Sequence, residues 1–387
     1  MKVPEILLVE SEHAPGSLAR ILQAIGESGL VVEELIAVRR DQDKTVWEIT
    51  LEMDEHTDYG LAERIAALPN ARLLGESDRV FDRHRGGKIR TVARTPVKSL
   101  QELRDIYTPG VARVCLAIQR DPDKVREYTN LPRTVAIVTN GTAVLGLGDI
   151  GAQAGLPVME GKAALMAQFA ELSGVPILLG TRDPAEVIAT VKAIAPSFGA
   201  IQLEDIAAPA CFEVEGALRD ALDIPVMHDD QHGTAVIVLA ALHNATRRVG
   251  RELCGSVIGQ IGLGAAGIGI ARLLMAYGVK TVIGSDPQPL ARERLESMGG
   301  RAAPLEELMR NAEIVIATSG RPGLIEPAWI RRGQIILALS NPEPEIEAAD
   351  ALAQGAAFAA DGRAINNLLG FPGLFRGALE AGAKRFT

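Results

Sequence analysis

The sequence predicts an α/β protein in which two regions with parallel sheets follow a smaller antiparallel region. Three observations support this fold class. Residues 5–77 show strand and helix patterns in the order βαββαβ, and strands and helices alternate from residue 99 onward. A glycine triplet then follows an apolar strand near residue 262. The length of 387 residues exceeds one ordinary domain and suggests two or three.

The first region, residues 1–82, has the element order of a ferredoxin-like domain. Its expected strands are 5–11, 31–38, 45–53 and 71–77, and its expected helices are 17–29 and 59–68. The stretch APGSLARILQAIGESGL at 14–30 resembles the start of an ACT regulatory domain, where small effectors bind beside the loop that contains Gly16. The resemblance implies an ACT-like domain with an effector site at Gly16. The residues themselves also fit a tight turn at Gly16 in a domain that only dimerises.

The second region follows a basic stretch at 83–98, which contains two adjacent glycines and a proline and is expected to be a solvated linker. From 99 to 235 the alternation is typical of a parallel sheet with helices on its faces. Ahead of this alternation, residues 134–149 predict a hairpin with Asn140 and Gly141 in the turn. The expected strands are 175–179, 200–204 and 224–228, and the expected helices are 161–173, 184–194, 212–222 and 232–248.

The third region, residues 236–362, is predicted to be a Rossmann-type dinucleotide-binding domain. A G-x-G-x-x-G motif opens a helix directly after an apolar strand, and the next strand ends at an aspartate about 20 residues later. The glycines let the backbone approach a pyrophosphate at the positive end of the helix. The aspartate would repel a 2′-phosphate, so NAD is favoured, while Arg292 and Arg294 leave NADP as an alternative. The predicted cofactor-binding residues here are Gly262, Gly264, Ala265, Ala266, Gly267 and Asp286.

Acidic pairs follow two neighbouring strands of the second region. Glu204 and Asp205 come at the end of one strand, and Asp229 and Asp230 come after the next. Either pair alone would fit a solvated loop or a helix cap. Four carboxylates at adjacent strand ends would repel one another and raise their own pKa values, and a divalent cation removes that conflict. Because all the ligands are oxygens, magnesium or manganese is expected.

Two histidines, His228 and His232, flank the second acidic pair. Their spacing suits a metal such as zinc only when both lie on one continuous helix, and here a turn from strand to helix divides them. We therefore expect structural roles for both.

Two further residues are candidates for proton transfer. Lys162 is expected in the first turn of a helix, where the positive helix end and a nearby cation would lower its pKa and favour a base. Tyr107 precedes a Thr-Pro-Gly turn and fits either a proton donor or a packing residue.

Composition excludes several classes of protein. The net charge of −9 argues against nucleic acid as a partner, because such binding relies on Lys and Arg. The apolar runs are too short for a signal peptide or a membrane span, so a cytoplasmic protein is expected. Cys115, Cys211 and Cys254 are widely spaced, which predicts buried free thiols rather than disulfides or a zinc site.

Together these motifs resemble a bacterial-type malic enzyme over roughly residues 87 to 380. The matching stretches are IYTPGVA, VLGLGDIGAQAGLPVMEGKAAL, IQLEDI, HDDQHGTA, QIGLGAAGIGIA, ALSNP and INNLLGFPGLFRGAL. The resemblance implies oxidative decarboxylation of malate to pyruvate and carbon dioxide with NAD(P) and a divalent metal, in a homodimer. It also implies that 99–235, rejoined by 363–387, form the substrate and metal domain.

The resemblance assigns the proton-transfer roles. Lys162 matches the base that takes the malate hydroxyl proton as hydride moves to nicotinamide, and Asp229 matches a neighbour that polarises it. Tyr107 matches the acid that protonates the enol, supplied by either subunit.

Other roles also follow from the resemblance. Glu204, Asp205 and Asp230 match the metal ligands, and Asn341 and Asn367 match amides that contact substrate and nicotinamide.

The chain departs from the family pattern in two places. Ala143 and Val144 stand where the large eukaryotic-type enzymes have an arginine that grips a malate carboxylate, so the holder of that carboxylate is not assigned. Members also usually continue through further helices beyond the point where this sequence ends, so a shortened C-terminus is expected.

Three alternatives remain at this stage. A malolactic-type reaction would use the same site to form lactate with bound NAD. An amino-acid dehydrogenase would share the two-domain plan but would not need four carboxylates around a metal. A non-catalytic sensor would bind nucleotide and effector without turnover, which the set of Tyr107, Lys162 and both acidic pairs disfavours.

Overall fold

The computed structural model describes residues 2–54, 59–76, 79–144 and 146–387. The chain forms two compact units, residues 1–88 and 89–387, and each is described by itself. Ser77, the last residue of the strand expected at 71–77, lies outside the described residues. Leu145, in the stretch at 144–165 that resembles malic enzymes, also lies outside them.

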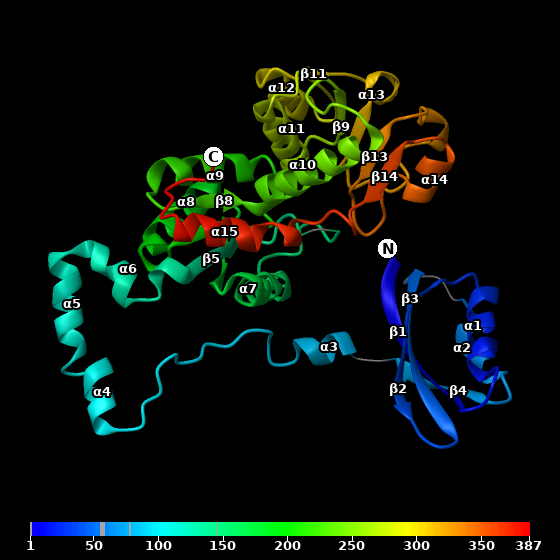
Figure 1. Ribbon diagram of the computed structural model, residues 1–387, viewed down its shortest axis with the longest axis horizontal. Coiled ribbons are helices and arrows are strands. Elements are labelled where there is room, and N and C mark those ends of the chain that lie inside the picture. Colours follow the sequence, from blue (N-terminus) through cyan, green and yellow to red (C-terminus); the bar gives the residue numbers. More distant parts are fainter. Residues whose placement is uncertain (1, 55–58, 77–78, 145) are drawn as a thin grey trace. The chain divides into compact units, whose positions relative to one another are not determined.

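The first unit contains a four-stranded antiparallel sheet with the strand order β2-β3-β1-β4 (Figure 1). Alternate residues of the strands, such as Leu7 and Val9, pack against Ile21 of α1 and Ile65 of α2. The predicted order βαββαβ is confirmed for the described residues. The elements are β1 (Lys2–Glu12), α1 (Ser17–Glu27), β2 (Val32–Arg40), β3 (Lys44–Asp54), α2 (Leu61–Ala66) and β4 (Ala71–Glu76), followed by α3 (Arg79–His84).

The second unit begins with three helices that precede its first sheet: α4 (Leu100–Ile106), α5 (Val111–Arg120) and α6 (Val125–Tyr128). None of the residues of these helices is buried. One consequence is that Cys115 on α5 is exposed, so the prediction that all three thiols are buried was wrong. Of the other two, Cys211 is buried and Cys254 is half-buried, and all three are free.

The first sheet of this unit is parallel throughout and has the strand order β6-β5-β7-β8. Apolar side chains cover both faces, with α8 and α9 on one side and α7 and α15 on the other. The strands are β5 (Thr134–Thr139), β6 (Ser173–Leu178), β7 (Ala200–Leu203) and β8 (Val226–His228), and the helices are α7 (Leu156–Ala170), α8 (Pro184–Ile194), α9 (Ala210–Ala221) and α15 (Phe371–Glu380).

The hairpin predicted at Asn140 and Gly141 is absent from the described structure. The strand before them, β5, pairs with β6 on one edge and β7 on the other, so no edge is left for an antiparallel partner. Gly141 instead turns the chain into a loop with a φ of 66°, and its carbonyl accepts a hydrogen bond from Gly151.

The second sheet is also parallel and has the order β11-β10-β9-β12-β13-β14, which is the strand order 3-2-1-4-5-6 of a Rossmann fold. Its inner strands at Ile314–Ala317 and Ile335–Ala338 are continuous apolar runs because both faces of the sheet are covered. The elements are β9 (Val257–Ile261), α11 (Ala265–Tyr277), β10 (Thr281–Ser285), α12 (Pro289–Ser297), β11 (Arg301–Ala302), α13 (Leu305–Asn311), β12 (Ile314–Ala317), β13 (Ile335–Ala338), α14 (Ala348–Ala353) and β14 (Phe358–Asp361).

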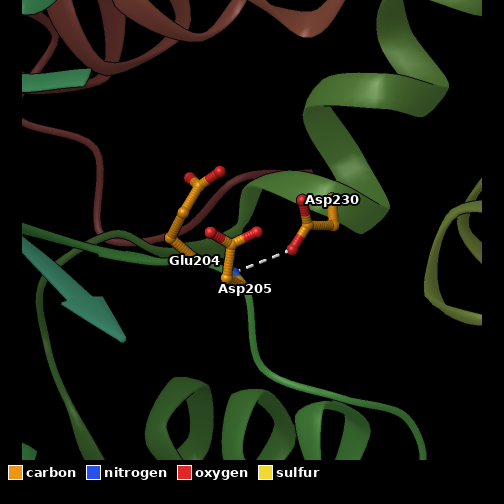
Figure 2. A group of neighbouring side chains, drawn as sticks. All are labelled: Glu204, Asp205 and Asp230. Atoms are coloured by element: carbon orange, nitrogen blue, oxygen red, sulfur yellow. Dashed lines mark hydrogen bonds between the residues drawn. The ribbon is translucent and has the colours of Figure 1, made fainter. Parts of the chain in front are cut away.

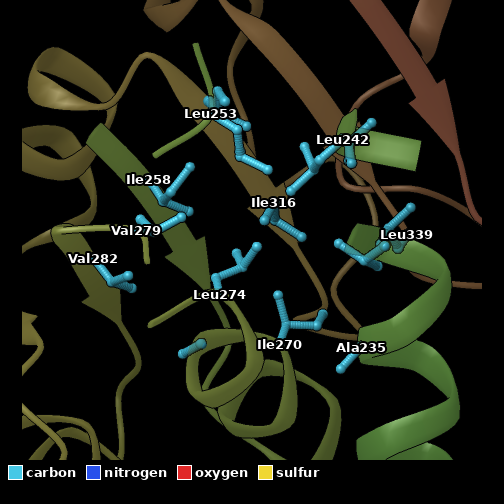
Figure 3. Packing of buried hydrophobic residues seen from close by; sticks show 14 of the residues in the cluster. Ala235, Leu242, Leu253, Ile258, Ile270, Leu274, Val279, Val282, Ile316 and Leu339 are labelled. Carbon is cyan, nitrogen blue, oxygen red and sulfur yellow. The ribbon is translucent and has the colours of Figure 1, made fainter. Parts of the chain in front are cut away.

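One helix, α10 (Asp229–Val249), connects the two parallel sheets. Its first turn directly follows β8, whereas Ala235 and Leu242 farther along pack with Ile270 and Leu274 of α11 in the core of the second sheet (Figure 3). The domain boundary predicted between residues 235 and 236 therefore lies inside a continuous helix. None of the helices in the described ranges is both long and apolar enough to cross a bilayer.

The contact between α10 and α11 is close enough to require a glycine. A Cβ atom on Gly269 of α11 would lie 2.4 Å from the carbonyl oxygen of Gln231 in α10. Backbone cannot yield as a flexible side chain can, so one of the two helices would have to move.

We predict that Gly269→Ala lowers the free energy of unfolding by about 1–3 kcal/mol, because the added methyl group forces the helices apart. Gly216→Ala is the matched control. Gly216 lies in α9, and a Cβ added there would have no atom within 4 Å, so alanine is expected to stabilise by about 0.5–1 kcal/mol. Urea denaturation followed by circular dichroism measures both effects. A midpoint for Gly269→Ala equal to or above that for Gly216→Ala would contradict the tight contact.

Candidate metal and catalytic site

The candidate site lies in the parallel sheet β6-β5-β7-β8, where the strand order reverses direction. The sheet starts at β5 and is extended on one side by β6 and on the other by β7 and β8. In such sheets the helices on either side of the reversal leave a crevice at the carboxyl ends of the strands. Glu204 and Asp205 follow β7 at that point, and Asp229 and Asp230 follow β8.

Three of the four carboxylates face one another (Figure 2). One oxygen each of Glu204, Asp205 and Asp230 lies within 4.8 Å of the others. Glu204 and Asp205 are buried, and the side chain of Asp230 is 27% exposed. The structure thus brings together the three residues that were predicted as metal ligands.

The backbone of Asp205 is fixed in an unusual conformation. Its φ is 53°, in the left-handed region that few residues other than glycine adopt. Its carbonyl oxygen accepts hydrogen bonds from Thr142 and Ala143, which follow β5, and its N–H donates to Oδ2 of Asp230 over 3.0 Å. These bonds hold a strained residue at the centre of the cluster, which is typical of functional sites.

The electrostatics of the cluster favour a cation. Burial and the neighbouring carboxylates raise the pKa of Asp205 to about 9 and that of Asp230 to about 6, and burial raises the pKa of Glu204 as well. Oδ2 of Asp205 is buried without a hydrogen-bond partner among the described residues. An unpaired buried oxygen and a set of hard carboxylate ligands fit a magnesium or manganese ion.

Lys162 extends from α7 into the same cluster. Its Nζ lies 2.5 Å from Oδ2 of Asp229 and 2.9 Å from Oε1 of Glu204. The predicted position in the first turn was wrong, because α7 begins at Leu156 and Lys162 falls in the second turn. Pro157 in the first turn does not interrupt the helix, since the amides there have no partner within the helix.

The lowered pKa predicted for Lys162 assumed a nearby cation, and in the protein without a cation the pKa is raised. Burial would lower this pKa, but the adjacent charges of Asp229 and Glu204 outweigh burial and raise it. The helix N-terminus has little influence, because the dipole effect falls off beyond the first turn.

The surroundings of Lys162 include two residues of the C-terminal segment. The side-chain oxygen of Asn367 lies 3.4 Å from Nζ, so the structure places this predicted residue at the site. The ring of Phe371, at the start of α15, has its centroid 4.5 Å from Nζ. No role was predicted for Phe371, because an apolar residue at a helix start looks like any core residue.

Gly233 is another residue for which no role was predicted. It lies in α10 one turn after Asp229, and a Cβ there would lie 1.8 Å from Oδ1 of that aspartate. The missing side chain therefore leaves room for the carboxylate that contacts Lys162. The sequence could not show this role, because only the fold decides that the Asp229 side chain lies against Gly233.

The glycine triplet has the geometry expected of a dinucleotide-binding loop. A Cβ on Gly262 would lie 2.7 Å from the carbonyl oxygen of Thr318, and one on Gly267 would lie 1.9 Å from that of Gly262. Gly264, the N-cap of α11, has open space on that side, where the backbone can approach a pyrophosphate. Ala265 and Ala266, also predicted to bind the cofactor, form the start of α11.

Asp286 lies beside this loop, as the motif requires. Its carboxylate accepts hydrogen bonds from the N–H groups of Leu263 and Gln288, each over 2.8 Å. Arg292 bonds to the carbonyl oxygens of Asp286 and Pro287, and Arg294 stacks 4.2 Å from the ring centroid of Phe212. Both guanidinium groups are therefore engaged by other parts of the chain.

Among the described residues, two predicted site residues of the second unit, Tyr107 and Asn341, make no hydrogen bond to the carboxylate cluster. Tyr107 is the C-cap residue of α4 and is 68% exposed, and among the described residues its hydroxyl makes no hydrogen bond. Asn341 donates to the carbonyl oxygen of Gly362 over 3.4 Å. Gly16, in the first unit, is the N-cap of α1 with a φ of 84°.

These features define an α/β protein with a Rossmann-type nucleotide-binding sheet next to a parallel sheet that presents an acidic cluster. Residues 86–185 match the family model "Malic enzyme, N-terminal domain", and residues 223–320 match "D-isomer specific 2-hydroxyacid dehydrogenase, NAD binding domain". The chain is 53% identical to NAD-dependent malic enzyme 1 of Bacillus subtilis over 97% of its own length and 86% of that protein. It therefore belongs to the malic enzyme family.

Two further comparisons agree with this assignment. The bifunctional malic/malolactic enzyme of Bacillus subtilis is 39% identical over 77% of this chain and 78% of that protein. The crystal structure of malic enzyme from Pyrococcus horikoshii superposes with a TM-score of 0.75 and 40% identity, and covers 80% of each chain. The resemblance drawn from the motifs is thereby confirmed at the level of the family.

The raised pKa of Asp205 predicts a pH-dependent stability in metal-free protein. The folded pKa of about 9 lies above the ordinary value of 3.8. The contribution of Asp205 to the free energy of unfolding is therefore fully present below about pH 4 and is lost as the pH rises through 9. Asp205→Asn cannot ionise, and we expect it to unfold a few degrees above the wild type at pH 9. Thermal unfolding in chelator at pH 6, 7.5 and 9 tests this.

The exposed Asp220 of α9 supplies the control, because Asp220→Asn is expected to follow the wild-type pH dependence. Curves for Asp205→Asn that ran parallel to the wild type at all three pH values would contradict the prediction.

Proposed function

We propose that this protein converts malate to pyruvate and carbon dioxide while reducing NAD, with a divalent cation at Glu204, Asp205 and Asp230. The observation that supports this most directly is the contact of Lys162 with both Asp229 and Glu204 beside that acidic cluster. It places an amine next to the position where a hydroxy acid would meet the metal. The names of the relatives describe the same class of enzyme.

Lys162 is proposed as the base that removes the hydroxyl proton of malate. It must be neutral to do so, whereas the carboxylates of Asp229 and Glu204 favour the ammonium form and raise its pKa. Positive charge at the acidic cluster would offset those carboxylates and lower the pKa of Lys162. Asp229, buried and in contact with Nζ, would hold the amine in place and take part in passing its proton onward.

A cation held by Glu204, Asp205 and Asp230 would supply Lewis-acid chemistry, which would polarise a ketone and ease the loss of carbon dioxide. NAD would accept the hydride. Asn367, at 3.4 Å from Nζ of Lys162, is proposed to orient the substrate, and Asn341 to contact substrate and nicotinamide. The hydrogen bonds around Asp205 keep the cluster rigid before substrate arrives.

NAD is proposed as the preferred cofactor. The carboxylate of Asp286 lies at the glycine loop, where it would bond to ribose hydroxyls and repel a 2′-phosphate. The two arginines that could have offset this repulsion are bonded elsewhere: Arg292 to backbone carbonyls and Arg294 on Phe212.

Tyr107 is proposed to act as the proton donor to the enol, in the site of a second copy of this chain. Its helix α4 and the following α5 bury none of their own residues, and apolar side chains such as Leu100 and Ile106 are 73% and 46% exposed. These helices would be covered in a homodimer, which is the commonest symmetric assembly. The same contact would bring Tyr107 to the acidic cluster of the second copy.

The first unit is proposed to be an ACT-like regulatory domain. Its antiparallel sheet, its element order and the positive φ of Gly16 at the start of α1 support this. The guanidinium of Arg20 lies near Gly16 and gives this loop a positive group, which suits a small anionic effector.

The proposed reaction predicts equal amounts of reduced cofactor and pyruvate. Purified protein incubated with malate, manganese and NAD should gain reduced cofactor in step with pyruvate formation, more slowly with NADP, and not at all in chelator. Ultraviolet absorbance and a pyruvate assay follow the two products. Lys162→Ala should lower turnover by about 10²–10⁴-fold while NAD binding is kept. Lys192→Ala, at an exposed position of α8, should keep wild-type turnover.

Other results would overturn the proposal. Lactate without net NADH would indicate a malolactic reaction instead. Full activity in chelator would exclude a metal-assisted mechanism, and unchanged turnover in Lys162→Ala would exclude this lysine as the base.

The proposed position of Tyr107 predicts complementation between two inactive variants. If Tyr107 acts in the site of the second copy, mixed dimers of Tyr107→Phe and Lys162→Ala contain one intact site. Random reassortment should then restore about a quarter of wild-type activity. The measurement is turnover after the two variants are unfolded and refolded together, compared with each variant refolded alone. If Tyr107 acts within its own chain, no mixture recovers activity.

A further inference from the structure

A buried glutamate with no role in the proposed reaction joins two loops of the nucleotide-binding sheet. Glu345 is fully buried in the segment that follows β13. Its Oε1 accepts hydrogen bonds from the backbone N–H and the hydroxyl of Ser319, over 2.7 and 2.8 Å. Oε1 also accepts from the hydroxyl of Ser340 over 2.5 Å, and Oε2 accepts from the N–H of Ser340 over 3.3 Å. The donors from both serines replace the water that this carboxylate loses on burial.

The two serines follow neighbouring strands. Ser319 comes after β12 and Ser340 after β13, and these parallel strands pair with Ala317 opposite Ala338. The carboxyl ends of parallel strands lie at one edge of a sheet, so both loops leave the sheet at the same edge. Glu345 connects them there.

Glu345 also fixes the direction of both serine hydroxyls. A hydroxyl has one hydrogen to donate and two lone pairs that accept. Because each hydroxyl donates its hydrogen to the carboxylate, its lone pairs are left for other donors. The Ser340 hydroxyl accepts from the N–H of Gly320 over 2.8 Å, and the Ser319 hydroxyl accepts from the N–H of Arg321 over 3.2 Å. The carboxylate therefore holds the backbone of residues 319–321 both directly and through the two hydroxyls.

The loop after β12 borders the glycine loop. The sheet reverses its strand order between β9 and β12, and in such sheets a nucleotide lies beyond the carboxyl ends of these strands. The N–H of Thr318 donates to the carbonyl oxygen of Ile261 over 2.8 Å. The side-chain amide of Gln260 donates to the carbonyl oxygen of Gly262 over 3.1 Å and to the hydroxyl of Thr318 over 3.0 Å. The loop that Glu345 holds is thus bonded to the loop that would bind the pyrophosphate.

We propose that Glu345 is a positioning residue for dinucleotide binding: it fixes the loops after β12 and β13 in the free protein, before the nucleotide binds. The proposal rests on the dinucleotide site proposed above. Loops that are already ordered lose less conformational entropy on binding, which raises affinity. The loop after β13 also carries Asn341, which directly follows Ser340 and is proposed to contact substrate and nicotinamide.

Glu345→Gln tests this role, because glutamine is similar in size but has only one acceptor oxygen. Its NH₂ group would face the N–H of Ser319 or that of Ser340, so one loop would lose its acceptor. We expect the dissociation constant for NADH, measured by the fluorescence of the bound cofactor, to rise about 10-fold. Charge alone predicts the opposite, because the variant removes a negative charge from the domain that binds an anionic ligand. Tighter binding would therefore overturn the proposal.

Steady-state kinetics and thermal unfolding separate positioning from a purely structural role. Positioning predicts that KM for NAD rises in proportion to the dissociation constant, while kcat at saturating NAD stays within about threefold. A purely structural role predicts a lower unfolding temperature without cofactor and an unchanged dissociation constant for NADH in the folded protein. That second result would overturn the proposal.

A matched control lies two residues farther along the chain. Glu347 is exposed and is the N-cap residue of α14, to which its side chain makes no capping hydrogen bond. Glu347→Gln removes the same charge as Glu345→Gln and should bind NADH within about twofold of the wild type. Equal weakening in the two variants would contradict a role that depends on the hydrogen bonds of Glu345.

A second variant tests the path through one hydroxyl and keeps the charge. Ser340→Ala removes the group that links the N–H of Gly320 to Glu345. We expect it to weaken NADH binding about threefold or more. In the double variant with Glu345→Gln, the loss should be smaller than the product of the two single losses, because both changes act on one network. A loss equal to that product would overturn the shared path.

The binding assay needs no malate, so its result is independent of the proposed reaction. Wild-type protein that bound NADH no more tightly than Glu345→Gln would overturn the role of Glu345 alone. Wild-type protein that bound no NADH would overturn the proposed dinucleotide site and this inference with it.

Discussion

Charge compensation among buried carboxylates is the constraint on which this site depends. Four acidic side chains meet at the ends of two adjacent strands, and three of them, Glu204, Asp205 and Asp229, are almost fully buried. Taking such charges out of water is costly unless positive groups or hydrogen-bond donors replace the lost hydration. Lys162 compensates part of this negative charge, and the backbone N–H of Asp205 stabilises the carboxylate of Asp230. A bound cation would balance the remaining charge. We therefore expect the site to be most stable in its metal-bound form.

A single helix connects this electrostatic arrangement to the nucleotide-binding sheet. The first residues of α10 are two of the acids, and its later turns lie in the core of the second sheet. The glycine at 269 lets α11, which begins at the pyrophosphate loop, pack directly against the backbone of Gln231. Rigid helices in close contact fix the distance between the acids and the nucleotide loop, and hydride transfer depends on that distance.

The sequence alone was sufficient to predict much of the site. The two acidic pairs, Glu204 with Asp205 and Asp229 with Asp230, were expected together because parallel strands present their carboxyl ends at one edge. The resemblance to malic enzymes then selected Glu204, Asp205 and Asp230 as the metal ligands. The glycine triplet and Asp286 were assigned from spacing, because the tight turn permits few other residues. The hairpin at Asn140 was predicted wrongly, since a two-residue turn signal cannot show that both edges of a strand are already occupied. The start of α7 was also misplaced, because proline reads as a break although the first turn tolerates it.

What the sequence determined by itself is local or periodic: the alternation of strands and helices, the glycine loop, and the acids at strand ends. Each depends on interactions within a few residues or on a repeating pattern. Tertiary structure alone decided which distant groups meet: Lys162 with Asp229 and Phe371, and Gly233 with the carboxylate of Asp229. It also raises the pKa of Lys162 in the metal-free protein, because two carboxylates that are distant in the sequence lie beside its Nζ. Distances through space set electrostatic energies, and the folded chain alone fixes those distances.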